Sequence, residues 1–258
     1  MKQRIITGLS AGIFFLFLAF IGGVAFVMLA VVMASVGYME FLRMKKISPF
    51  SFPGIVGLIA VILMVPHVRF ALLPPLQMLL IALLLLLAFT VLSKNMFHFD
   101  KSAFIILSVL YVGFGFHFLV EARVLDNGLN VLFFILLAIW STDSGAYFAG
   151  RAVGKRKLWP DISPNKTIEG ALGGIAAALA VAVLYEWFFP VYESIWASVA
   201  AGLVIAIFGQ LGDLIESAFK RHYGVKDSGA ILPGHGGILD RCDSWLLVFP
   251  VLHLFHFI

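Results

Sequence analysis

Apolar residues follow one another in long runs along most of the chain, and short polar, glycine- or proline-containing segments separate these runs. Splitting the sequence at those segments predicts nine helices, each near the length of about 20 residues that the hydrocarbon core of a bilayer requires. The predicted limits are 5–21, 24–42, 52–67, 72–92, 102–120, 129–150, 168–189, 195–219 and 244–258. The cuts at Gly22-Gly23 and at Pro74-Pro75 rest on the weakest signals. The pattern predicts an all-α, polytopic integral membrane protein.

The composition supports this class, since 62% of the residues are apolar and 12% are charged, against about 45–50% and about 25% in soluble domains. Little chain is left for a separate soluble domain. The formal charge of +4 is interpreted as an orientation signal, so no nucleic-acid partner is expected. The first residues have the basic and apolar regions of a signal peptide, but the apolar run continues to Tyr38, which favours an uncleaved first helix.

The distribution of basic residues predicts the orientation of the helices. With a cytoplasmic amino terminus and nine spans, all of the 18 Lys and Arg residues except Arg69 and Arg123 fall on the cytoplasmic side. The prediction is therefore N-in and C-out, in the cell (inner) membrane. It places both long polar loops, 151–167 and 220–243, in the cytoplasm, where an active site would meet nucleotides.

The two halves of the chain differ in their polar content. Residues 1–128, with about five helices, carry few polar groups inside their apolar runs, whereas residues 129–258 hold nearly every acidic and glycine-rich feature. We interpret the first half as a transmembrane scaffold and the second as the catalytic region.

Acidic residues in the second half suggest a divalent-metal site. Asp213, Glu216 and Lys220 lie at i, i+3 and i+7, on one face of a helix. Asp240 and Asp243 lie at i and i+3 at the start of the last run, and carboxylates of this kind suit Mg²⁺. Two structural alternatives stay open: an ion pair between Glu216 and Lys220, and helix capping by Asp240.

Basic and glycine-rich segments around these acids suggest binding of phosphate. Exposed amides, basic groups and Mg²⁺ are recurring parts of phosphoryl-transfer sites. Their alternative is a positive-inside loop with a glycine turn. The candidates are the loop residues Lys220, Arg221, Lys226, His235, Gly236, Gly237 and Arg241, together with Ser163 and Lys166 just ahead of a helix start. Two acids complete the candidate residues: Asp227 near the start of the loop, and Asp143 in an intramembrane polar patch that could line the site.

The segment Ser217–Asp243, "SAFKRHYGVKDSGAILPGHGGILDRCD", resembles the signature of the phosphatidate cytidylyltransferases, also called CDP-diacylglycerol synthases. It contains S-x-x-K-R, K-D-x-G and P-x-H-G-G-x-x-D-R-x-D. The segment "SPNKTIEG", residues 163–170, is similar to a second stretch of that family, with Asn165 where a second lysine is usual. The resemblance covers roughly residues 135–258.

This resemblance implies transfer of CMP from CTP to phosphatidic acid, giving CDP-diacylglycerol and pyrophosphate in phospholipid biosynthesis. It implies Mg²⁺ as cofactor, with room for a monovalent cation such as K⁺, and a homodimer in the lipid bilayer. Asp213, Asp240 and Asp243 are then the metal-site candidates, and the catalytic set adds Lys220 and Arg221. The substrate-binding set is Asp143, Ser163, Lys166, Ser217, Lys226, Asp227, His235, Gly236, Gly237 and Arg241.

Two other functions stay open from the sequence. A CTP-dependent lipid (polyprenol) kinase would use similar groups but would release CDP instead of pyrophosphate. A cation-coupled transporter would also carry intramembrane acids, but it would take up ions or substrates without consuming CTP.

Overall fold

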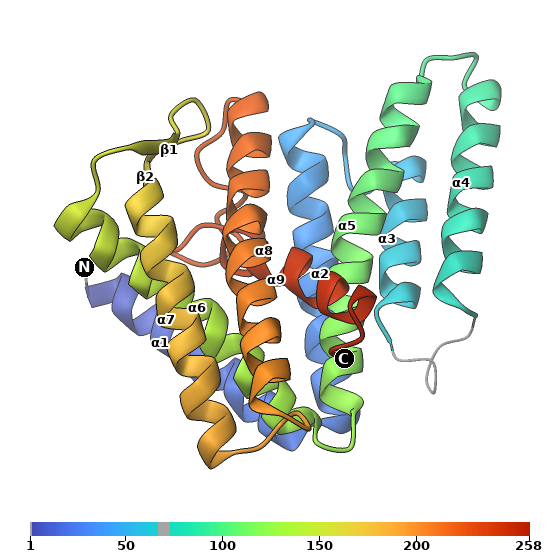
Figure 1. Ribbon diagram of the computed structural model, residues 1–258. Helices are drawn as coiled ribbons and strands as arrows, with labels where there is room; N and C mark the ends of the chain where they lie inside the picture. The colour runs from blue at the N-terminus through green and yellow to red at the C-terminus, as the bar shows by residue number, and fades with distance from the viewer. Residues whose placement is uncertain (1, 67–72) are drawn as a thin grey trace. The chain divides into compact units, whose positions relative to one another are not determined.

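A computed structural model describes residues 2–66 and 73–258, with side chains described from residue 6 onward. Within these residues the chain forms nine helices and two short strands (Figure 1). They are α1 (Lys2–Ile21), α2 (Gly23–Met44), α3 (Phe52–Met64), α4 (Pro75–Leu92), α5 (Phe99–Val124), α6 (Gly128–Val153), β1 (Lys157–Trp159), β2 (Ser163–Thr167), α7 (Ile168–Phe188), α8 (Ile195–His222) and α9 (Leu239–Leu254).

Each predicted apolar run corresponds to a helix, and both weak cuts are confirmed. The last helix differs most from its predicted limits of 244–258, since α9 begins at Leu239 and ends at Leu254. Gly22 separates α1 from α2 with a φ of 69°, a conformation that glycine adopts without steric cost. Pro74 precedes α4, and Pro75 is its first residue, where a missing N–H costs no helical hydrogen bond. The predicted limits at 67 and 72, and the predicted outside position of Arg69, lie outside the described residues.

Six helices of the described chain are long and apolar enough to cross a membrane: α2, α4, α5, α6, α7 and α8. The apolar part of α1, Ile6–Ile21, and α3 are shorter, and α9 has 16 residues with Pro250 inside it. The all-α, multi-pass character is thereby supported, while the count of nine spans remains a prediction.

Contacts divide the chain into two compact units. The first comprises Met1–Glu121 and Tyr223–Cys242, and the second comprises Ala122–His222 and Asp243–Ile258. In the first unit α2 packs against α1 and α3, and α3 packs against α4. In the second, α7 packs against α6 and α8 (Figure 1). The polar loop 223–242 belongs to the first unit, and the predicted division of roles at residue 128 remains a prediction.

Small residues bring α6 and α7 into backbone contact. A Cβ at Gly145 would lie 2.6 Å from the Cβ of Ala177, and one at Gly174 would lie 2.7 Å from the carbonyl oxygen of Thr142. At Gly173 a Cβ would collide with the Cβ of Ala149. Close approach of this kind is typical of small residues spaced along membrane helices.

The segment that precedes α7 is a two-stranded antiparallel sheet, whereas the sequence predicted only a polar loop. Lys157 pairs with Thr167, and Trp159 pairs with Ser163. The Thr167 hydroxyl accepts a hydrogen bond from Gly170 N at 3.1 Å and so caps α7. The Glu169 carboxylate accepts from the amide of Lys155 at 3.0 Å. These bonds hold the hairpin against the start of α7.

Candidate functional site

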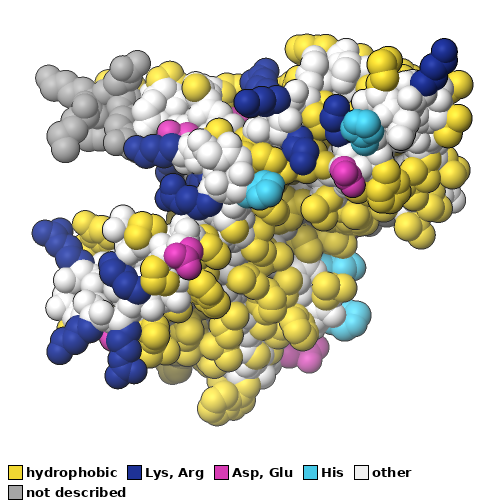
Figure 2. Space-filling view, turned by 90° about the horizontal axis from the view of Figure 1, so that it is seen from above, with side chains coloured by type: hydrophobic (Ala, Val, Ile, Leu, Met, Phe, Trp, Pro, Cys, Tyr) yellow, Lys and Arg dark blue, Asp and Glu magenta, His cyan; other side chains and the backbone are white. Residues whose placement is uncertain are grey.

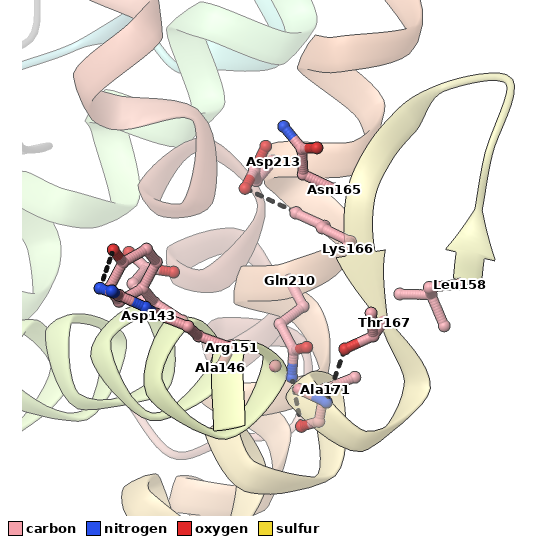
Figure 3. Close-up of a pocket in the computed structure, with 13 residues that line it drawn as sticks. Asp143, Ala146, Arg151, Leu158, Asn165, Lys166, Thr167, Ala171, Gln210 and Asp213 are labelled. Atoms are coloured by element: carbon pink, nitrogen blue, oxygen red, sulfur yellow. Dashed lines mark hydrogen bonds and ion pairs between the residues drawn. The ribbon is translucent and has the colours of Figure 1, made fainter. Parts of the chain in front are cut away.

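A cavity of about 450 Å³ opens in the second unit, between α6, α7, α8 and the β1–β2 hairpin (Figure 3). Its small-residue wall comes from α6 and α7, through Ala146, Gly150, Gly170 and Ala171. Its polar lining comprises Asp143, Tyr147, Arg151, Asn165, Lys166, Thr167, Gln210 and Asp213. Leu158 adds one apolar side chain to the lining.

An ion pair crosses this cavity from the hairpin to α8. Lys166 Nζ lies 2.6 Å from Asp213 Oδ2, and the two side chains are 26% and 34% exposed (Figure 3). Asp143, on α6, is close enough to interact electrostatically with both Asp213 and Lys166. Three predicted residues from three different elements thus line one cavity.

Asp243 adds a further carboxylate to this group from the start of α9. Its charge interacts with those of Asp213, Asp143 and Lys220. Glycine allows the approach, because a Cβ at Gly212 would lie 2.6 Å from the Asp243 carbonyl oxygen. Ser244 Oγ donates to Gly209 O at 3.0 Å and fixes the same contact between α8 and α9.

The three carboxylates repel one another but do not form a complete metal site. Across residues 2–66 and 73–258, no group of three or more His, Cys, Asp or Glu side chains is placed to hold a metal ion. The charges of Asp143, Asp213 and Asp243 nevertheless concentrate negative potential beside Lys166. A cation or a positively charged side chain is needed to balance it.

The other predicted residues of α8 make contacts within the second unit. Lys220 Nζ lies 2.9 Å from Glu216 Oε2, and Glu216 is 1% exposed, so the ion pair left open by the sequence is present. Ser217 Oγ donates to Asp213 Oδ1 at 3.3 Å. Arg221 Nε donates to Ile162 O at 3.2 Å and joins the end of α8 to the hairpin turn.

Asp240 belongs to the first unit, where it organises the glycine-rich loop. Its Oδ2 accepts hydrogen bonds from Ser228 N at 2.8 Å, Ser228 Oγ at 2.9 Å and Gly237 N at 2.8 Å. The donors lie in the loop and not in the first turn of α9, so the predicted capping alternative does not describe these bonds. Asp240 therefore joins both ends of the loop to the helix start.

Glu40, which the sequence analysis missed, is a second anchor of this loop. The carboxylate comes from α2, is 1% exposed, and accepts from Ile238 N at 3.0 Å, Leu239 N at 3.0 Å and Ser228 Oγ at 3.1 Å. Gly237 leaves the space that the Glu40 carboxylate fills. The available signal was a lone carboxylate in an apolar run, which is costly unless it has partners.

His235 and Arg241 lie at the tip of the same loop. Arg241 donates to the His235 carbonyl oxygen from Nε at 3.0 Å and from Nη2 at 2.8 Å. The His235 imidazole packs on α1, where a Cβ at Gly8 would lie 2.7 Å from its Nε2. Gly236 has a φ of 83°, which explains why glycine stands there.

The remaining predicted residues lie outside the 450 Å³ cavity lining. Lys226 and Asp227 are exposed in the loop of the first unit. Ser163 begins β2 opposite Trp159.

Three residues of the second unit line the cavity without having been predicted: Tyr147, Arg151 and Gln210. Gln210 Nε2 donates to Ala206 O at 3.0 Å and to Ala171 O at 3.3 Å.

Comparison with known proteins gives similarity along almost the whole chain. The model of the cytidylyltransferase family matches residues 2–258. A phosphatidate cytidylyltransferase of Bacillus subtilis is 49% identical over 259 residues, which cover 98% of this chain and 96% of that protein. Phosphatidate cytidylyltransferases of Staphylococcus epidermidis and Staphylococcus aureus are each 44% identical over 257 residues, with 98% of both chains covered.

Proposed function

Because this chain belongs to the cytidylyltransferase family, we propose that it transfers CMP from CTP to phosphatidate, giving CDP-diacylglycerol and pyrophosphate. The observation that carries the proposal is the near full-length similarity to relatives named for this reaction. The substrates are then CTP and phosphatidate, and the product is a lipid-linked nucleotide for phospholipid biosynthesis.

The reaction needs neutralisation of charge more than it needs a general base. A phosphate oxygen of phosphatidate forms a bond to the α-phosphorus of CTP, and the bond from that phosphorus to the bridging oxygen of the β-phosphate breaks. The attacking oxygen is already anionic, so no proton has to be removed from it. Lys166 and Arg151, which line the cavity, are the described cations suited to hold phosphate oxygens there.

Mg²⁺ fits a pair of carboxylates of which Asp213 lines the cavity and Asp243 interacts with Asp213, as a site shared with substrate. Mg²⁺ is typically held by one or two carboxylates together with substrate phosphates. Asp213 and Asp243 supply two oxygen donors whose charges already interact, and Lys166 currently balances Asp213. We assign these two carboxylates to hold the ion. When bound, it would offset charge on the phosphates and on the leaving pyrophosphate.

The predicted participation of Asp240 in this metal site, and that of a monovalent cation such as K⁺, remain predictions. The described hydrogen bonds of Asp240 Oδ2 go to the loop of the first unit. A homodimer, which the family resemblance implies, also remains a prediction.

We further propose nine spans, with the amino terminus in the cytoplasm, the carboxyl terminus outside and the active site facing the cytoplasm of the cell (inner) membrane. The bias of Lys and Arg supports this orientation. The hairpin 157–167, at the end where α6 finishes and α7 begins, would then lie on the cytoplasmic side (Figure 1).

The test uses purified protein in detergent with phosphatidate, Mg²⁺ and CTP labelled either at the α- or at the γ-phosphate. Transfer of CMP puts the α-label into lipid and the γ-label into pyrophosphate. A lipid kinase would put the γ-label into an added polyprenol and release CDP. Uptake into vesicles without consumption of CTP would instead indicate a transporter.

A matched pair of variants connects the activity to the cavity. Asp213→Asn removes a carboxylate from the lining, and we expect loss of more than about a hundredfold in turnover. Asp100→Asn removes one from an exposed position at the start of α5 and should leave turnover unchanged. Equal activity of the two variants would contradict the assignment of the site.

A further inference from the structure

A second cavity, of about 420 Å³, lies in the first unit. It is formed where α2 and α4 end and where α3 and α5 begin, so all four helices contribute the same end of their bundle (Figure 1). Its lining combines three lysines with three aromatic rings: Lys45, Lys46, Lys101, Phe52, Phe89 and Phe97.

The lysines give this cavity an excess of positive charge. Within the described chain, no Asp or Glu forms an ion pair with Lys45, Lys46 or Lys101. Lys45 Nζ instead lies over the rings of Phe104 and Tyr223, 5.5 Å and 5.6 Å from their centroids. Cation–π contacts fix the position of an ammonium group but leave its charge unneutralised. The three lysine ammonium groups around this cavity, none of them paired with a carboxylate of the described chain, favour an anionic ligand.

The rings give the same cavity an apolar wall. The centroids of Phe52 and Phe89 are 4.9 Å apart, and those of Phe89 and Phe97 are 5.6 Å apart. Phe52 is half-exposed. An amphiphile would place its charged group at the lysines and its acyl chain along these rings, whereas a soluble anion would use the lysines alone.

Orientation of the helices by positive charge alone does not explain the arrangement. Arg43 and Lys94 belong to the same two helix ends, are exposed, and contribute equally to the charge bias without lining the cavity. Figure 2, which looks onto this end of the helices, shows Lys and Arg side chains set among hydrophobic ones. Basic pockets between membrane helices on the cytoplasmic side bind lipid head groups.

We propose that this cavity binds the phosphate of an anionic phospholipid. Lys45, Lys46 and Lys101 hold the phosphate oxygens, and the rings of Phe52, Phe89 and Phe97 pack against the beginning of an acyl chain. The proposal concerns a lipid that binds without reacting, so it does not depend on the proposed reaction.

The test measures binding of fluorescent phosphatidylglycerol to the full chain in detergent, with fluorescent phosphatidylcholine as a zwitterionic probe. The double variant Lys46→Gln/Lys101→Gln removes two cavity charges and keeps the aromatic contacts of Lys45. Arg43→Gln/Lys94→Gln removes the same net charge outside the cavity. We expect phosphatidylglycerol binding to weaken at least about tenfold in the first variant and less than about twofold in the second.

Equal weakening in both variants would overturn the proposal, as would unchanged binding in a cavity variant that keeps its thermal unfolding midpoint. Phosphatidylcholine that binds as tightly as phosphatidylglycerol would also overturn it. Inorganic phosphate that binds the same variant-sensitive site as tightly as the lipid would assign the cavity to a soluble phosphate instead. If the double variant does not fold, Lys46→Gln alone changes one exposed side chain, and we expect about a fivefold effect.

Discussion

Substitution of Glu40 perturbs the glycine-rich loop without touching any loop residue. The Glu40 carboxylate is 1% exposed and accepts three hydrogen bonds, from Ile238 N, Leu239 N and Ser228 Oγ. Glu40→Gln keeps the shape of the side chain but replaces one acceptor oxygen with an NH₂ donor. We therefore expect Glu40 to be a positioning residue for residues 228–239, and not a residue that contacts substrate.

The size of the effect follows from the bonds that each variant loses. If the Gln carbonyl oxygen takes the place of Oε2, it keeps Leu239 N and Ser228 Oγ and faces Ile238 N with its amide. One hydrogen bond to a charged group is worth about 1.5–3 kcal/mol. If the loop loses about 2 kcal/mol of stability, the equilibrium constant for its opening rises about thirtyfold. Glu40→Ala leaves the Ile238 and Leu239 amides without this acceptor, while Ser228 Oγ can still donate to Asp240 Oδ2. We therefore expect the free energy of loop opening to fall by at least about 3 kcal/mol, and the opening equilibrium constant to rise more than about a hundredfold.

The direct assay is hydrogen exchange of the Ile238 and Leu239 amides, read together with kcat/KM for CDP-diacylglycerol formation. Exchange should rise about thirtyfold in Glu40→Gln and further in Glu40→Ala. Glu40→Asp, which keeps the charge, should restore part of the protection. Glu193→Gln, an exposed acid between α7 and α8, is the control. Wild-type exchange at both amides in Glu40→Gln would refute this reasoning.

Three further outcomes follow from the described contacts. Asp240→Asn keeps an oxygen for Ser228 and Gly237 but removes the charge, so we expect turnover to be abolished, and near-normal activity would contradict a role as metal ligand. Lys166→Met removes the ion-pair partner of Asp213, and we expect kcat/KM for CTP to fall at least about tenfold; unchanged kinetics would contradict the assignment of the cavity. Gly173→Ala forces a methyl group against α6 and should lower the free energy of unfolding by about 1–3 kcal/mol. Gly12→Ala, which has nothing described within 4 Å of its added Cβ, should not, so equal thermal stability of the two variants would contradict the packing argument.

The helices were predictable because each apolar run is long and because Gly22 and Pro75 interrupt the pattern where two helices meet. The β1–β2 hairpin was not, since β1 has three residues and is too short to show an alternating pattern. Its strands are joined by pairing between Lys157 and Thr167, which no local signal announces.

The site was predictable in residue type more than in pairing. Asp143, Lys166 and Asp213 were all expected at a site, and Asp243 was expected near Asp213, as the structure has it. Helical spacing related Asp213 to Glu216 and Lys220 but gave no sign of its ion pair with Lys166. The bonds from Glu40 to the loop were equally hidden, because Glu40 and Ser228 are 188 residues apart. Spacing along one helix shows which residues share a face, and it says nothing of what faces them.

The backbone contact between α6 and α7 has a consequence for which substrates the cavity of the second unit is able to accept. Where the two helices meet, the cavity wall consists of Ala146, Gly150, Gly170 and Ala171, residues that already have the smallest side chains. Substitution by smaller residues is therefore almost impossible at these four positions, and it cannot make room here for a bulkier substrate. An engineered enlargement has to begin at the longer side chains of the lining, such as Tyr147 of α6, Leu158 and Asn165 of the hairpin, and Gln210 of α8.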